Sequence, residues 1–80
     1  MRIDKYLKVS RIIKRRTVAC EACENKRVLI NGKVAKPSQE VKINDIITIL
    51  FGDNVAKFKV ININENNKKT DILLYEVVNE

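Results

Sequence analysis

The sequence contains no histidine, and this shortage removes several classes of function. Histidine is the side chain that most often serves as a general base, so its absence counts against ordinary acid–base catalysis. The sequence also has no glycine-rich phosphate loop, no nucleophile elbow and no paired carboxylates. A chain of 80 residues leaves little room for a substrate pocket. The sequence therefore predicts a protein that is not an enzyme and needs no cofactor.

Cysteine is also scarce, with Cys20 and Cys23 forming a single C-x-x-C pattern. A closed zinc site takes four ligands, and a chain with no histidine and no second cysteine pair cannot supply them. A thioredoxin-like role would need the motif to follow a strand in a β–α–β unit, which the sequence does not show. We expect a packing role, with Cys23 in the core and Cys20 nearer the surface. A thiol enzyme remains an alternative that replacement of both cysteines by serine would test.

Long apolar runs are missing as well. No stretch approaches the roughly 20 apolar residues that cross a bilayer, and the N-terminus shows no secretory signal pattern. Two cysteines without such a signal indicate a reducing compartment. We therefore expect a cytoplasmic protein without membrane contact, folded as one domain over residues 1–80.

The lysines and arginines that are present are unevenly distributed along the chain. Residues 1–36 carry eleven basic residues against three acidic ones, whereas residues 37–80 carry five against seven. All five arginines lie within the first 27 residues. A solvated face that only keeps the protein soluble is the plain alternative, but solubility gives no reason to sort charge in this way. The pattern predicts a face that binds a polyanion.

A short helix is predicted at the N-terminus. Ile3, Tyr6 and Leu7 follow the i, i+3, i+4 spacing of one helical face within residues 3–9. Ser10 is expected to end this helix and cap it.

A second helix is expected from about residue 16 to about residue 25, with Thr17 as a candidate cap. Small side chains on its apolar stripe would let the first helix approach closely: Val18, Ala19, Ala22 and Cys23.

From Val28 onward the pattern indicates short strands. Asn31-Gly32 between two apolar runs is typical of a type I′ hairpin. Further strands are expected at residues 46–51, 55–63 and 72–78, with loops at residues 36–40 and 62–67. Helices followed by strands favour an α+β fold, with two N-terminal helices packed on a small, mostly antiparallel sheet of four to five short strands.

The basic N-terminal segment carries the strongest functional signal. Its cations recur every three residues and then cluster: Arg2, Lys5, Lys8, Arg11, Lys14, Arg15 and Arg16. On one continuous helix this spacing would drift by about 60° per step, whereas a break near Ser10 lets both clusters face one ligand. Lysine and arginine neutralise phosphates, and arginine adds bidentate geometry and stacking on bases. The start of the second helix would offer free N–H groups to one more phosphate.

Asp4 and three later cations have a less certain place in this face. Asp4 is either a helix acid favoured by the dipole or a group that orients Arg2, Lys8 or a nucleotide hydroxyl. The pair Lys26-Arg27 and Lys33 beyond the hairpin turn either extend the basic face or are incidental surface charges.

Together these motifs resemble the S4 RNA-binding domain family. The resemblance lies in Arg2-Ile3-Asp4-Lys5-Tyr6-Leu7, Ser10-Arg11, Lys14-Arg15-Arg16-Thr17 and Arg27-Val28-Leu29-Ile30-Asn31-Gly32. It covers residues 1–52, which it implies are the RNA-binding core with the alpha-L motif, and it leaves residues 53–80 as strands that complete the sheet. With the cations of the basic pattern, the full set of expected RNA-binding residues is Arg2, Asp4, Lys5, Lys8, Ser10, Arg11, Lys14, Arg15, Arg16, Thr17, Lys26, Arg27 and Lys33.

The chain is most similar to free-standing members of the family, relatives of the heat-shock protein of fifteen kilodaltons. This implies binding to a large ribosomal subunit obstructed by peptidyl-tRNA. There such proteins contact rRNA and hold the tRNA while the nascent chain receives a C-terminal tail. Arg2 and Arg16 would lead these contacts, with Lys5, Arg11, Lys14 and Arg15 in support. A protein tailing factor is an expected partner, and we expect a monomer.

Two other functions stay open at this point. The protein could be a ribosome-assembly factor or a general binder of structured RNA. It could also be a helix-turn-helix DNA-binding module, since two short basic helices imitate one.

Overall fold

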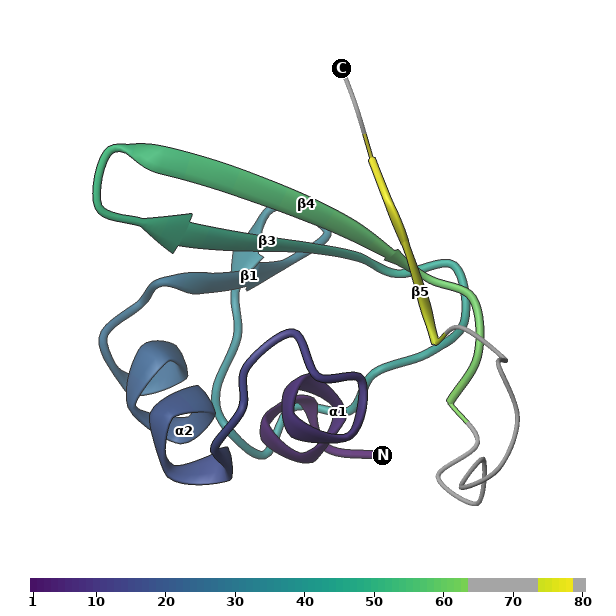
Figure 1. The fold of residues 1–80 in the computed structure, drawn as a ribbon, viewed down its shortest axis with the longest axis horizontal. Coiled ribbons are helices and arrows are strands. Elements are labelled where there is room, and N and C mark those ends of the chain that lie inside the picture. Colours follow the sequence, from purple (N-terminus) through teal and green to yellow (C-terminus); the bar gives the residue numbers. More distant parts are fainter. Residues whose placement is uncertain (64–73, 79–80) are drawn as a thin grey trace.

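The computed structural model describes residues 1–63 and 74–78. Its elements are α1 (Ile3–Val9), α2 (Arg16–Glu24), β1 (Val28–Ile30), β2 (Lys33–Val34), β3 (Ile46–Phe51), β4 (Asn54–Val60) and β5 (Tyr75–Val77). The strands form one sheet in the order β2-β1-β3-β4-β5, and every neighbouring pair is antiparallel. Both helices lie on the same side of this sheet (Figure 1). The predicted α+β fold is confirmed, and the sheet has five strands.

The first helix forms as its spacing predicts. Ile3, Tyr6 and Leu7 are fully buried, and the helix ends with Ser10 in the C-cap position. The next residue, Arg11, adopts the left-handed conformation with φ of 66°. A residue of this conformation often follows a helix, because its N–H can bond to a carbonyl of the last turn. Here the N–H of Arg11 donates to the Lys8 carbonyl at 3.1 Å.

The second helix departs from the prediction in two details. Its N-cap is Arg15, which makes no side-chain capping bond, so Thr17 lies inside the first turn and does not cap the helix. Ala19 and Cys23 are buried as expected, whereas Val18 is 47% exposed. At 100° per residue Val18 lies about 140° from Cys23 around the helix axis, which places it on the solvent side.

The hairpin between β1 and β2 has the predicted turn. Asn31 and Gly32 both have positive φ, 53° and 84°, as a type I′ turn requires. The Asn31 side chain also accepts from the Ile46 N–H at 2.9 Å and donates to Asp45 at 3.1 Å. These bonds connect the hairpin to the start of β3.

The later strands are shorter than the sequence suggested. The observed β4 ends at Val60, although residues up to 63 were expected in it. The expected strand at residues 72–78 appears as Tyr75–Val77, with residues 72 and 73 outside the described residues. Most of the loop expected at 62–67 also lies outside them.

The core fills the space between the helices and the inner face of the sheet. Val28, Ile47, Ile49 and Val60 contribute from the strands, each at most 1% exposed. The hydroxyl of buried Tyr6 donates to the Leu74 carbonyl at 2.6 Å. That carbonyl also accepts from the N–H groups of Ile61 and Asn62, at 3.1 and 3.3 Å. The first helix is therefore bonded directly to the segment that leads into β5.

Neither helix could cross a membrane. Within the described ranges, α1 and α2 have seven and nine residues, and no helix there is long and apolar enough to span a bilayer.

Candidate nucleic-acid interface

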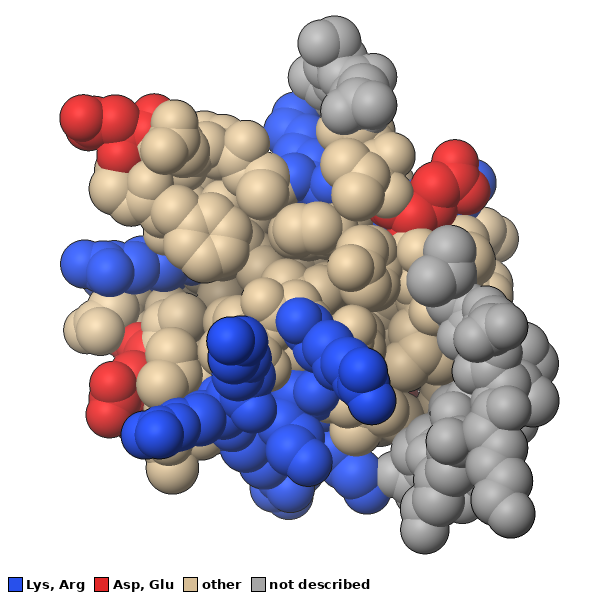
Figure 2. All heavy atoms as spheres, in the orientation of Figure 1, with Lys and Arg blue, Asp and Glu red and all other residues tan. Residues whose placement is uncertain are grey.

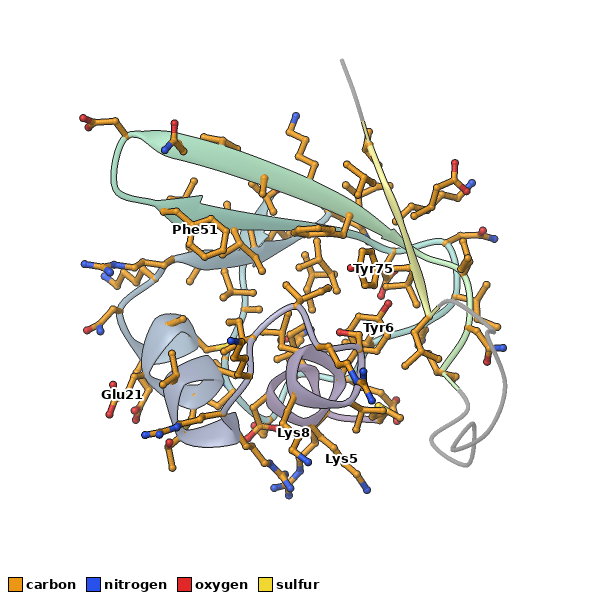
Figure 3. The ribbon with its side chains drawn as sticks, in the orientation of Figure 1. Lys5, Tyr6, Lys8, Glu21, Phe51 and Tyr75 are labelled. Carbon is orange, nitrogen blue, oxygen red and sulfur yellow. The ribbon has the colours of Figure 1, made fainter. Side chains whose placement is uncertain are left out.

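The first helix directs lysines away from the sheet because its apolar residues take the opposite side. Lys8 is exposed and Lys5 is partly exposed, and one helical turn separates them. Figure 3 shows both side chains extending from α1 on the side away from the strands. Arg2, exposed at the N-cap position, has its backbone held by a bridge to Glu40.

The start of α1 is fixed by a distant loop. The N–H groups of Ile3 and Asp4 donate to the carbonyls of Gln39 and Pro37, at 2.7 and 3.3 Å. These bonds satisfy donors that a helix start otherwise leaves open. They also bring exposed Lys36, which precedes Pro37, close to the basic helix. Lys36 was not among the residues predicted to bind RNA. Its position just before the loop proline was the one signal in the sequence that pointed to this placement.

The turn between the helices presents a second group of cations. Ile13 is 9% exposed, and its N–H donates to the Leu7 carbonyl at 3.0 Å. With this side chain turned inward, Arg11, Lys14 and Arg15 stay exposed. Ser10 takes no part in this surface, since it is 9% exposed and its hydroxyl donates to the Leu7 carbonyl at 3.3 Å.

An ion pair joins the two helices across this turn. The Arg16 guanidinium lies 3.4 Å from Asp4 Oδ1. The Asp4 side chain is 12% exposed and that of Arg16 is 47% exposed. Asp4 lies in the first turn of α1, as expected for a helix acid, and it pairs with Arg16 rather than with Arg2 or Lys8. The carboxylate is thus mostly buried, whereas about half of the Arg16 side chain stays exposed to solvent.

The first turn of α2 adds backbone donors to the same region. The first bond within the helix runs from the Ala19 N–H to the Arg15 carbonyl at 3.1 Å. The three preceding N–H groups, of residues 16–18, have no acceptor among the described residues. Thr17 is exposed beside them. This is the arrangement in which the N-terminus of a helix favours an anionic ligand.

These groups form one surface, which we call the α1–α2 basic face. It comprises Arg2, Lys5, Lys8, Arg11, Lys14, Arg15 and Arg16. Figure 2 shows Lys and Arg side chains gathered over α1 and the turn to α2, with no acidic side chain among them in this view. The acidic residues Glu21 and Glu24 are exposed further along α2, and Figure 3 shows Glu21 on the side of α2 away from α1. They limit the face on that side.

The remaining predicted contacts lie elsewhere. Lys26 and Arg27 follow the C-terminal end of α2, about 13 Å along the helix from Arg16, and both are exposed. Lys33 is exposed on β2, the edge strand of the sheet. The structure therefore separates these three cations from the α1–α2 basic face.

The two cysteines fit the packing role expected for them. Cys23 is 2% exposed and Cys20 is partly exposed, and both are free thiols. Burial, followed by the nearby Asp4 carboxylate, raises the pKa of Cys23 to about 11. Such a thiol is protonated at neutral pH and is a poor nucleophile. Among the described residues no group of three or more potential ligands could hold a metal ion.

A family model and individual relatives both match this sequence, and the two comparisons agree with each other. The family model described as "S4 domain" matches residues 1–47. Over the whole chain, the sequence is 48% identical to the RQC P-site tRNA stabilizing factor of Streptococcus pneumoniae, covering 92% of that protein. It is 47% identical to the protein of the same name from Listeria monocytogenes, covering 88% of it.

A solved structure agrees with the fold. A trimeric structure of Heat Shock Protein 15 from Vibrio cholerae matches 98% of this chain and 81% of its own, with a TM-score of 0.84 and 30% identity.

Proposed function

The chain belongs to the S4 domain family, and from this premise we propose that it is an RNA-binding factor of ribosome-associated quality control. It binds a large ribosomal subunit obstructed by peptidyl-tRNA, contacts rRNA and tRNA, and stabilises the tRNA while the nascent chain receives a C-terminal tail. The relatives named RQC P-site tRNA stabilizing factor support this role. The protein acts in the cytoplasm by binding, without catalysis of its own.

The observation that carries the proposal is the α1–α2 basic face with its ion pair. Cations that neutralise phosphates release counterions, so binding gains strength and becomes salt-dependent. Arg16 is held by Asp4 at 3.4 Å, which reduces the side-chain entropy that a long arginine loses on binding. Arg2 is fixed through its backbone bridge. Because the positions of these two arginines are restricted, the face suits one structured RNA better than it suits an arbitrary polyanion.

Residues 1–52 form the RNA-binding part in this proposal, and residues 53–80 complete the sheet that supports it. The protein works as a monomer beside a separate tailing factor on the ribosome. Mass measurement of the free protein in solution tests the monomer, and a stable trimer would contradict it.

The test of the function is co-sedimentation with large ribosomal subunits that carry peptidyl-tRNA. Arg2→Ala and Arg16→Ala should each weaken association about tenfold, in the range for hydrogen bonds to charged groups. Lys42→Ala is the matched control, since Lys42 is an exposed cation outside the face and should bind as the parent does. If both arginine variants co-sediment like the parent while remaining folded, the face is wrongly assigned.

The RNA recovered by crosslinking separates this function from ribosome assembly. Recovery of tRNA with one rRNA hairpin supports the tRNA-stabilising role, whereas recovery of precursor rRNA supports an assembly role. A helix-turn-helix DNA-binder would insert its second helix in the major groove. Here the exposed side of α2 carries Glu21 and Glu24, which would repel the phosphates lining that groove.

A further inference from the structure

An aromatic side chain is left half-exposed at the end of the sheet. Phe51 is the last residue of β3 and is 47% exposed. It continues the alternation of Ile47 and Ile49, so it points to the side of the sheet that carries the helices. Figure 3 shows it at the end of β3, on the side toward α2. Among the described residues, the hydrophobic side chains packed around the core do not include Phe51.

The turn that carries two cations lies beside the end of β3. The N–H of Leu50 donates to the Arg27 carbonyl at 2.8 Å, which joins the end of β3 to the turn between α2 and β1. Lys26 and Arg27 are both exposed in that turn. Figure 2 shows basic side chains at this edge of the molecule, separate from the larger group over α1.

The backbone of the turn is unusual for the residue it carries. Lys26 has a φ of 61°, at the position after the helix cap where glycine is most common. Its N–H donates to the Cys23 carbonyl at 3.0 Å, and the N–H of Arg27 donates to the Ala22 carbonyl at 2.9 Å. These two bonds form a Schellman motif, which fixes the direction in which the turn leaves α2. The two cations therefore start from a fixed backbone beside Phe51.

An exposed aromatic ring near a turn that carries two cations suits a nucleotide. Unpaired bases stack on aromatic side chains while neighbouring lysines and arginines hold the phosphates. Acidic side chains bound the site, with Glu24 at the end of α2 and Asp53 in the turn after Phe51. The same cations give an uncharged apolar peptide no advantage, so the observations favour RNA.

We propose that Phe51, together with Lys26 and Arg27, forms a second RNA contact in which an unpaired nucleotide stacks on the phenyl ring. This inference rests on the proposed function, since it takes the nucleotide to belong to the RNA held by the α1–α2 basic face. The site accounts for an exposed aromatic residue and two cations that the basic face does not include.

The test compares Phe51→Leu with Phe51→Trp in the full chain. Stacking on one base is worth about 5- to 150-fold in affinity, so Phe51→Leu should weaken binding to tRNA-carrying large subunits by that factor. Phe51→Trp should keep or improve it. Val55→Ala is the matched control, because Val55 is 60% exposed on the other face of the same hairpin. Thermal unfolding of each variant checks that the fold is retained.

The tryptophan variant also gives a direct signal, because the chain contains no other tryptophan. We expect its fluorescence to be quenched by an RNA hairpin with one bulged nucleotide and to change little with the fully paired hairpin. Equal binding of Phe51→Leu and the parent would overturn the proposal, as would equal quenching by both hairpins. If the parent protein itself does not bind RNA, the proposed function is refuted instead.

Discussion

At the scale of single residues, Asp4 and Arg16 show how an acidic group can serve a basic surface. Asp4→Asn keeps the size of the side chain and its oxygen acceptor but removes the charge that holds Arg16 at 3.4 Å. Because Arg16 is half-exposed and solvent weakens the pair, the free energy of unfolding should fall by less than about 1 kcal/mol.

The larger effect of Asp4→Asn should be on selectivity. Removal of a negative charge raises affinity for any RNA, while a loosened Arg16 lowers affinity for the specific site. We expect the ratio of affinities for tRNA-carrying large subunits and for an unrelated RNA hairpin to fall. Filter binding to both RNAs measures this ratio, and an unchanged ratio would contradict the positioning role of Asp4.

After its C-cap residue, each helix is followed by a cation with left-handed backbone, Arg11 with φ of 66° and Lys26 with φ of 61°. Residues other than glycine are strained in this conformation by about 1 kcal/mol. The favourable interaction of a cation with the helix C-terminus offsets part of this strain energy. Arg11→Gly should therefore leave stability unchanged or raise it slightly, and it should still weaken RNA binding. Urea unfolding and subunit co-sedimentation check the two effects, with Arg11→Ala as the variant that keeps the strain. A loss of more than 1 kcal/mol in Arg11→Gly would indicate that the arginine serves the fold.

The buried titrating groups predict a loss of stability at alkaline pH. Burial raises the pKa of Cys23 to about 11 and also raises that of Tyr6, so the folded state favours the neutral form of each group. The resulting stability is complete below the unfolded pKa of Cys23, near 9.0, and is lost as the pH rises through the folded value. Melting temperatures measured from pH 7 to 11 should fall above pH 9, and Cys23→Ala should make this fall less steep. The same slope in both proteins would show that the thiol is not responsible.

At the scale of elements, the link between α1 and the segment before β5 is the feature to test. Tyr6→Phe removes the bond from the tyrosine hydroxyl to the Leu74 carbonyl but leaves that carbonyl with its two N–H donors. The loss should be about 1 kcal/mol, as for one buried hydrogen bond with a remaining partner. Urea unfolding measures the loss, and hydrogen exchange of the Ile61 amide should accelerate with it. Unchanged stability would mean that the hydroxyl bond makes no net contribution.

Local patterns in the sequence were sufficient to predict most of the elements. The spacing of Ile3, Tyr6 and Leu7 identified α1, and Asn31-Gly32 identified the first hairpin, because both depend on residues close together in the chain. Val18 and Thr17 were placed wrongly, since the exact start and rotation of α2 are set by its packing against α1. The strand ends were also overestimated, because alternation continues beyond the last paired residue.

The basic residues of the candidate site were evident from the uneven charge, but their grouping was not. The pair of Asp4 with Arg16 spans 12 residues, and the approach of Lys36 to α1 depends on backbone bonds from a distant loop. Phe51 looked like one more strand residue, because exposure at the end of a strand depends on what packs there. Each of these required the tertiary structure.

At the scale of the whole molecule, the α1–α2 basic face predicts a strong dependence of RNA binding on salt. Each phosphate contact contributes about 0.7 to 0.9 to the slope of log K against log salt concentration. Arg16→Ala should reduce the slope by about one such contact, whereas Lys42→Ala should leave it unchanged. Titrations at several salt concentrations with tRNA-carrying large subunits measure this. Equal slopes for the parent and Arg16→Ala would show that Arg16 contacts no phosphate.

The bonds that fix α1 also bear on how the protein is made. The start of this helix depends on carbonyls at residues 37 and 39, and its tyrosine bonds to residue 74. The helix synthesised first is therefore fully held in place only after residue 74 has been made, because contacts distant in sequence must wait for their partners. The arginines of the N-terminus leave the exit tunnel long before they are fixed into a binding surface. We expect a nascent chain that ends before residue 74 to lack the finished basic face.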